Sequence, residues 1–176
     1  MDPPRAGFGA RAAASLLDVL VLLPALGIYV AVLYSLDANN KLTPNVEYLI
    51  DVSGSVFGVV YTTFEIFTAG TPGKLMLGLR IRDETGNAAD AARLTRRWLI
   101  KNGGTVVSVA GVALGMNIVE RTGDLIGLLI VVGFLFTLRE SRQAWYDEWA
   151  GTAVYRRKDL ESPRGFQPLV GETKGA

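Results

Sequence analysis

Two acidic side chains lie inside apolar stretches of this sequence, where a charge has chemical consequences. Asp18 is the only charged residue between Ala12 and Leu36, and Glu65 is the only one within residues 52–73. An ionised carboxylate in hydrocarbon is costly, so each acid needs a partner, a wet cavity or a proton. The pair therefore predicts either a proton or cation site or a buried polar clamp that locks helices together.

Arg11 is a candidate partner for Asp18. The two residues are seven positions apart, so on a helix they lie within about 20° of one face, with Asp18 about 10 Å deeper. Glu65 comes to a similar depth near the end of its own stretch. Two acids at one depth supply no path across a membrane, and this favours the clamp over the ion site.

The composition excludes several classes of protein. The 176 residues are 49% hydrophobic with a net charge of +1, which is typical neither of a disordered chain nor of a nucleic-acid binder. Cys and His are both absent, so thiolate and imidazole chemistry is excluded. We find no nucleophile motif and no metal-ligand constellation. We therefore expect no enzymatic activity, no metal, no cofactor and no nucleic-acid partner.

Four apolar stretches predict an all-α integral membrane protein. The first is longer than the roughly 20 residues that cross a bilayer. The third is rich in glycine, and the fourth is short for a full crossing. The fourth stretch therefore spans a thinned bilayer, extends at its ends with flanking residues that snorkel, or forms a tight hairpin with the third. The predicted spans are residues 12–36, 52–73, 102–119 and 125–138.

The basic residues predict the orientation of these spans. With four crossings, every Lys and Arg except Lys41 and Arg121 falls on one side. By the positive-inside rule, both termini and the loop 70–101 are then cytoplasmic. Amphipathic indole rings favour the membrane interface. The predicted interface anchors are Trp98, Trp145 and Trp149.

Some structure is expected outside the membrane. The alternation in Leu77–Arg82 and the short run Thr152–Tyr155 predict two strands that pair on the cytoplasmic side. Proline and glycine in residues 159–176 indicate an irregular tail after a membrane domain of residues 1–158.

Two segments have the pattern of helices that lie on the membrane surface. Residues 90–101 have a basic face suited to anionic lipid headgroups, and Arg142, Tyr146 and Trp149 lie at helical spacing. We expect Lys74 to extend its amine to the same interface. The GxxxG pairs Gly54/Gly58 and Gly111/Gly115 predict close contact with other helices, in self-association or with other membrane subunits.

Three blocks of the sequence resemble the RDD family of small multi-pass membrane proteins, which is named for one Arg and two Asp. They are Ala6-Gly7-Phe8 with Arg11, Ala14 and Asp18; Gly70-Thr71-Pro72-Gly73-Lys74 with Gly78-Leu79-Arg80-Ile81; and Arg142 to Asp147 with Ala150-Gly151-Thr152. By this resemblance Arg11, Asp18 and Asp147 form the naming triad. Tyr146 stands where the family often has His.

The resemblance implies a helical domain in a bacterial or archaeal cytoplasmic membrane, without a settled activity. Transport is the usual suggestion for the family, with cation/proton exchange in some relatives. Two hypotheses follow: a structural or accessory subunit that packs against larger membrane partners, or a minimal oligomeric transporter that uses Asp18 and Glu65. The candidate clamp or ion site comprises Arg11, Asp18, Glu65, Arg142 and Asp147.

Overall fold

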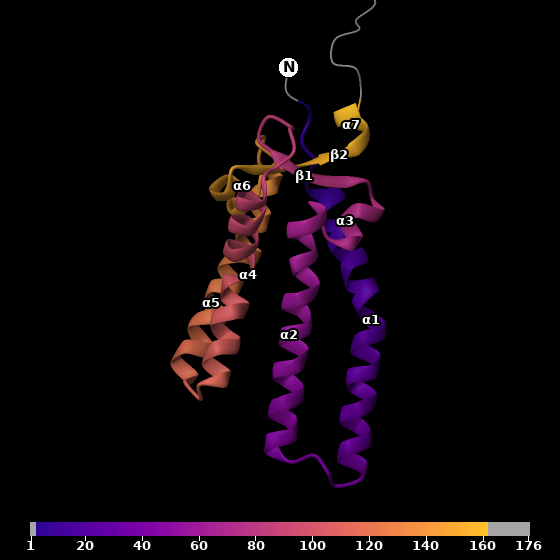
Figure 1. The fold of residues 1–176 in the computed structure, drawn as a ribbon, viewed down its shortest axis with the longest axis vertical. Helices are drawn as coiled ribbons and strands as arrows, with labels where there is room; N and C mark the ends of the chain where they lie inside the picture. The colour runs from indigo at the N-terminus through magenta and orange to yellow at the C-terminus, as the bar shows by residue number, and fades with distance from the viewer. Residues whose placement is uncertain (1–2, 162–176) are drawn as a thin grey trace, which may run out of the picture.

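The computed structural model describes residues 3–161, so most of the predicted tail, residues 162–176, lies outside the described residues. The described chain is largely helical, with two short strands (Figure 1). Its elements in order are α1 (Phe8–Ala38), α2 (Pro44–Thr68), α3 (Pro72–Met76), β1 (Leu79–Asp83), α4 (Ala91–Ala113), α5 (Asn117–Phe134), the 3-10 turn η1 (Leu135–Leu138), α6 (Trp145–Ala150), β2 (Thr152–Arg156) and α7 (Arg157–Glu161).

Three helical segments of the described chain are long and apolar enough to cross a membrane. They are α1, α2 and the continuous run of α5 and η1. Local sequence sets the bounds of α2: the Thr43 hydroxyl accepts a hydrogen bond from the Val46 amide at 3.4 Å, and Ala69 ends the helix in the left-handed conformation. The prediction of a helical membrane protein is confirmed at this level.

The predicted third span, residues 102–119, has the wrong bounds. α4 begins earlier and ends at Ala113, and α5 begins at Asn117 after a turn in which Gly115 has a φ of +65°. The bounds 102–119 were predicted from the absence of charged residues. A run of uncharged residues can continue through a turn, so it does not show where a helix ends. The third and fourth stretches form a tight antiparallel hairpin, one of the three expected alternatives. The helical run of the fourth stretch also begins earlier than predicted, at Asn117.

Glycines bring the two helices of this hairpin together. A Cβ added at Gly104 would overlap the backbone of Gly123 and Gly127, and one added at Gly111 would overlap the backbone of Glu120. Small residues thus let the helix backbones approach closely.

Within the described chain, the glycines of the two GxxxG pairs have different surroundings. Gly111 does contact a neighbouring helix, whereas Gly115 lies in the turn. A Cβ at Gly54 would meet only the Tyr29 ring at 3.7 Å, and one at Gly58 would meet nothing within 4 Å. Gly58 therefore marks open space within the described chain and not a helix contact.

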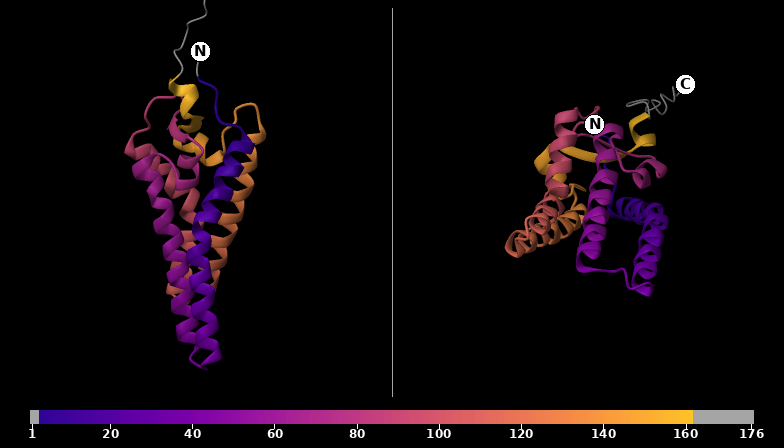
Figure 2. Two further views of the ribbon diagram at one scale, coloured as in Figure 1. Left: turned by 90° about the vertical axis from the view of Figure 1, so that its right-hand side faces the viewer. Right: turned by 60° about the horizontal axis from the view of Figure 1, so that its bottom comes forward.

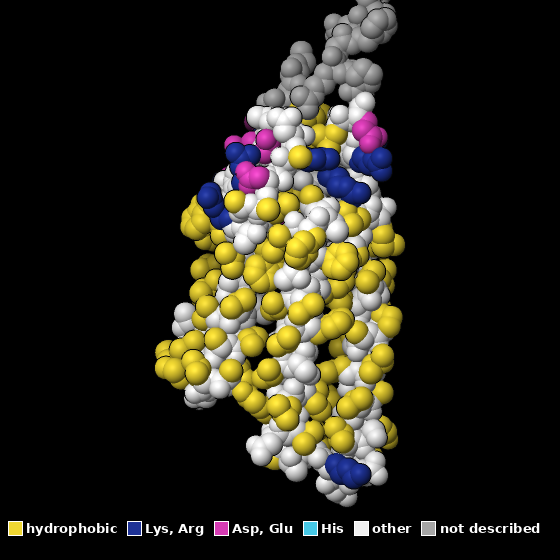
Figure 3. Space-filling model, viewed as in Figure 1, with side chains coloured by type: hydrophobic (Ala, Val, Ile, Leu, Met, Phe, Trp, Pro, Cys, Tyr) yellow, Lys and Arg dark blue, Asp and Glu magenta, His cyan; other side chains and the backbone are white. Residues whose placement is uncertain are grey.

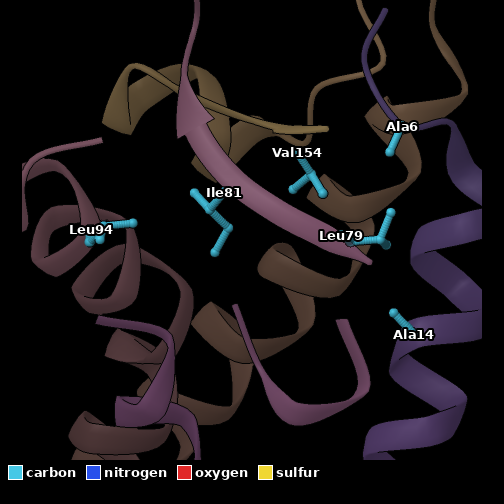
Figure 4. Close-up of a cluster of buried hydrophobic side chains, with 6 residues drawn as sticks. All are labelled: Ala6, Ala14, Leu79, Ile81, Leu94 and Val154. Carbon is cyan, nitrogen blue, oxygen red and sulfur yellow. The ribbon is translucent and has the colours of Figure 1, made fainter. Parts of the chain in front are cut away.

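The predicted pairing of two strands is confirmed. β1 and β2 are antiparallel, with Leu79 opposite Arg156 and Ile81 opposite Val154. Behind them lies a small apolar core contributed by segments distant in sequence (Figure 4). Its buried members are Ala6, Ala14, Leu79, Ile81, Leu94 and Val154.

The core lies at one end of the molecule. Both described chain ends meet there, while the α1–α2 pair and the α4–α5 hairpin extend away from the strands (Figure 1). The hairpin reaches less far than the α1–α2 pair in both side views (Figures 1 and 2). We call the end of the molecule that holds β1 and β2 the strand end. The α1–α2 pair and the α4–α5 hairpin each have one end there (Figure 1). Lys and Arg gather near the strand end, and hydrophobic side chains cover most of the rest of the visible face (Figure 3).

Candidate functional site

Asp147 is the centre of one group of ion pairs at the strand end. It lies in the first turn of α6, and its side chain is completely buried. Arg11 Nη1 from α1 lies 2.5 Å from Oδ2, and Arg97 Nε from α4 lies 2.6 Å from Oδ1. Burial raises the pKa of Asp147, but the charges of Arg97 and Arg11 and their hydrogen bonds outweigh it, so the pKa lies below its usual range.

Glu65 is the centre of a second group, in the last turn of α2. Its side chain is also completely buried. Lys74 Nζ lies 2.8 Å and Lys101 Nζ 3.2 Å from Oε2, and the Arg97 guanidinium contacts Oε1. Arg97 thus bridges the two acids, and the ring of Tyr146 lies 5.2 Å from its guanidinium carbon. We call these residues the ion-pair cluster: Arg11, Glu65, Lys74, Arg97, Lys101 and Asp147.

Asp18 has its own set of partners. Oδ1 accepts hydrogen bonds from the Tyr61 hydroxyl at 2.8 Å and the Gly73 amide at 2.7 Å, and Oδ2 accepts one from the Thr71 hydroxyl at 2.6 Å. Arg11, the candidate partner of Asp18 by spacing, is instead directed to Asp147, a residue of the returning C-terminal segment. Spacing placed the two on one helix face, but spacing does not specify which returning segment supplies the partner.

The segment from Gly70 to Lys74 connects both sites. Thr71 and Gly73 bind Asp18, and Lys74 binds Glu65. The expectation that Lys74 extends to the membrane interface is wrong, since this residue is buried. Gly73 lies so close to α1 that an added Cβ would overlap the Ala14 carbonyl oxygen and the Asp18 amide.

Arg142 contributes its backbone to the cluster. Its carbonyl accepts a hydrogen bond from Arg11 Nη2 at 3.0 Å. The Arg142 side chain is directed elsewhere and donates to the Arg5 carbonyl at 3.2 Å. The side chain predicted as part of the clamp therefore holds the N-terminal segment and not an acid.

The three predicted anchors have different surroundings. Trp98 Nε1 donates to Thr62 Oγ1 at 3.1 Å and so joins α4 to α2. Trp145 packs over Gly133, and its ring meets that of Trp149 edge to face with centroids 4.5 Å apart. Of these three, Trp149 is the most exposed, at 59%. Trp98 and Trp145 thus have packing roles between elements of this chain.

Arg97 and Lys101 are the partners that sequence reasoning missed. We expected the basic face of residues 90–101 to meet lipid headgroups, but Arg97 is buried and both side chains bind Glu65. Arg97 and Lys101 follow Leu94 at spacings of three and then four residues, so all three share one helix face. The apolar Leu94 on this otherwise basic helix face was the signal that the rest of the protein covers the face.

A comparison with protein families decides the family of the chain. The RDD family model matches residues 5–151, which include every residue of the ion-pair cluster and Asp18. The chain belongs to the RDD family. Neither the curated proteins nor the solved structures include a match to it.

In this RDD-family chain the naming residues do not form a single triad. Arg11 and Asp147 are in direct contact, whereas Asp18 binds Tyr61, Thr71 and Gly73. The two sites meet through Gly70–Lys74, which supplies ligands to Asp18 and a cation to Glu65. The arrangement joins α1, α2, α3, α4 and α6 at one end of the membrane helices.

Proposed function

We propose that this RDD-family chain is a non-enzymatic structural subunit that packs against larger membrane proteins in a bacterial cytoplasmic membrane. One observation carries the proposal: Arg97 bridges two completely buried acids, Glu65 and Asp147, from a third element of the chain. A carboxylate that binds and releases ions must reach water. Here each acid is surrounded by fixed cations, and this supports a locking role.

The proposal includes four crossings with both termini in the cytoplasm. The gathering of Lys and Arg at the strand end supports this orientation (Figure 3). The close contact of Gly104 with Gly123 and of Gly111 with Glu120 supports the fourth crossing. Because α4 and α5 are paired along their length, α5 does not cross a bilayer without α4.

Asp124 supports the presence of a partner. It lies about 10 Å along α5 from the start of the helix, and it is exposed apart from a hydrogen bond from Ser108 at 2.9 Å. A carboxylate at this depth in a membrane is costly, and among the described residues only Ser108 donates a hydrogen bond to it. We therefore infer that a polar group of another membrane segment covers it. Leu125, Leu128, Leu129 and Val132 form an adjacent exposed apolar stripe at helical spacing.

Partner recovery in a mild detergent tests the proposal. The tagged full chain is purified from its native membrane and analysed by quantitative mass spectrometry, beside Asp124→Leu and the matched surface variant Glu84→Leu. We expect a stoichiometric partner with the wild type and Glu84→Leu and a loss of it with Asp124→Leu. Recovery of a monomer alone contradicts the proposal, and partners that survive Asp124→Leu contradict the assigned contact.

A second candidate function is transport of cations or protons by an oligomer. The supporting observation is that Thr105 lines two adjoining cavities, one beside Asp18 and one beside Asp124, so polar groups follow one face of α4. Glu65 lines neither cavity. In liposomes this candidate requires flux that Asp18→Asn abolishes, and flux no greater than that of empty liposomes removes it.

A further inference from the structure

Two cavities meet between the membrane helices near Asp18. A polar cavity of about 340 Å³ lies between α1, α2 and α4, and an apolar groove of about 510 Å³ lies between α1 and α2. Leu22 and Gly58 line both, so the two cavities adjoin. Figure 3 shows hollows between the helices in the part of the molecule away from the strands.

The polar cavity presents two opposite charges. Among the described residues three donors reach the Asp18 carboxylate, which has about four acceptor positions. Lys101 is 23% exposed, and its ammonium, with three N–H donors, gives one to Glu65. The cavity therefore offers an acceptor to a cationic group and donors to an anionic group.

The apolar groove runs between α1 and α2, from the polar cavity toward the end of the helices away from the strands. Leu26, Tyr29 and Phe57 line it on the side away from the strands. The distance from Asp18 to Tyr29 along α1 is about 16 Å, close to half of the roughly 30 Å hydrocarbon layer. The site thus has a charged end and an apolar end separated by the depth of one lipid leaflet.

We propose that this space binds one phospholipid whose headgroup carries both a phosphate and a primary ammonium. The phosphate lies beside Lys101, the ammonium beside Asp18, and an acyl chain follows the groove between α1 and α2. A headgroup without an ammonium would bring its phosphate close to the Asp18 carboxylate without compensation.

Gly58→Leu tests the site, because it fills the junction of the two cavities. A Cβ at this position meets nothing within 4 Å, so the substitution has room in the fold. Gly27→Leu is the matched control: Gly27 also has nothing within 4 Å and lines neither cavity. The delipidated full chain is incubated with phosphatidylethanolamine, phosphatidylcholine or phosphatidylglycerol of identical acyl chains and analysed by native mass spectrometry.

We expect the wild type and Gly27→Leu to retain one phosphatidylethanolamine about tenfold more strongly than the other lipids, as one charge-assisted hydrogen bond allows. We expect Gly58→Leu to lose this retention and Asp18→Asn to lose the preference over phosphatidylglycerol. Equal retention of the three lipids overturns the proposal, as does unchanged retention in Gly58→Leu. A change of oligomeric state in Gly58→Leu, without a change in lipid, assigns the groove to a second copy and also overturns it.

Discussion

The Arg97 guanidinium contacts Glu65 and, through Nε, lies 2.6 Å from Oδ1 of Asp147, although these two acids are 82 positions apart along the chain. A single buried cation therefore ties the end of α2 to the start of α6. Removal of one member of a buried pair leaves an uncompensated charge, which is costly.

Arg97→Gln should be among the most destabilising single substitutions. After this substitution Glu65 keeps only Lys74 and Lys101 as cationic partners among the described residues, and Asp147 keeps only Arg11. We expect a loss of about 3–5 kcal/mol in the free energy of unfolding. Arg93→Gln is the control on the same helix, since this side chain is 44% exposed in its ion pairs; we expect a change of less than about 1 kcal/mol. Denaturant unfolding in detergent measures both, and equal losses would argue against the bridging role.

Asp18→Asn should be tolerated better than Asp18→Leu. The amide retains an acceptor for Tyr61 and Gly73, and its NH2 group can donate to the Thr71 hydroxyl. Leucine leaves all three donors without this partner, at about 1–3 kcal/mol for each buried group. Comparison of the yield of monodisperse protein and of thermal midpoints checks this order. If both variants behave alike, the hydrogen bonds to Asp18 contribute little to folding.

Gly73→Ala should disrupt the contact of α3 with α1. An added Cβ overlaps the Ala14 carbonyl oxygen and the Asp18 amide, and both belong to a helix backbone that cannot yield locally. Gly103→Ala is the control, because a Cβ there meets nothing within 4 Å and alanine favours helix by up to about 1 kcal/mol. Thermal unfolding should show a lower midpoint for the first variant and an unchanged or higher one for the second.

Stability should fall in acid because of Asp147. Its pKa is lowered in the folded protein, so its contribution is present above the unfolded pKa of about 4 and is lost as the pH falls toward the folded pKa. The slope for one such group is at most about 1.4 kcal/mol per pH unit. Unfolding measured between pH 8 and pH 3 should show a plateau and then this decline, and Asp147→Asn should reduce the decline.

Asp83 serves as the control for this acid dependence. Burial raises the pKa of this half-buried residue at the end of β1, but hydrogen bonds from Thr85 and Asn87 and the charge of Arg93 lower it overall. Asp83→Asn should leave most of the decline intact. If the loss of stability in acid vanishes in Asp83→Asn, the titrating group responsible is Asp83 and not Asp147.

Single cysteines should report four crossings, since the natural chain has no Cys to interfere. We expect an impermeant maleimide to label Lys41→Cys and Met116→Cys in intact cells and Glu84→Cys only after permeabilisation. All three positions are exposed in the structure. Labelling of Lys41→Cys without Met116→Cys would mean that the α4–α5 hairpin enters the membrane and returns without reaching the far side.

Much of the fold follows from local patterns in the sequence. The apolar lengths around Leu23 and Val60 predict membrane helices, and the alternation around Ile81 predicts the strand that pairs with Val154. These features depend on neighbouring residues, because side-chain period and length decide them. The turn at Gly115 escaped prediction because a charge-free run does not reveal where a helix ends.

The candidate site was only partly predictable. Asp18 and Glu65 are conspicuous because charges are rare in apolar stretches, and Arg11 and Asp147 were implied by the family blocks. Their partners were not deducible. Arg97 looked like a surface cation, and the assignment of Arg11 to Asp18 relied on one helix alone.

The sequence by itself determined the kind of protein: a chain with long apolar helices, a strand pair and two isolated acids that require compensation. Only the tertiary structure decided which cation compensates which acid. The reason is physical, because hydrophobic period and length act along one helix, whereas an ion pair between buried groups depends on where separate helices meet. Glu65 and Asp147 share Arg97 only because the strands and α3 bring the ends of α1, α2, α4 and α6 together.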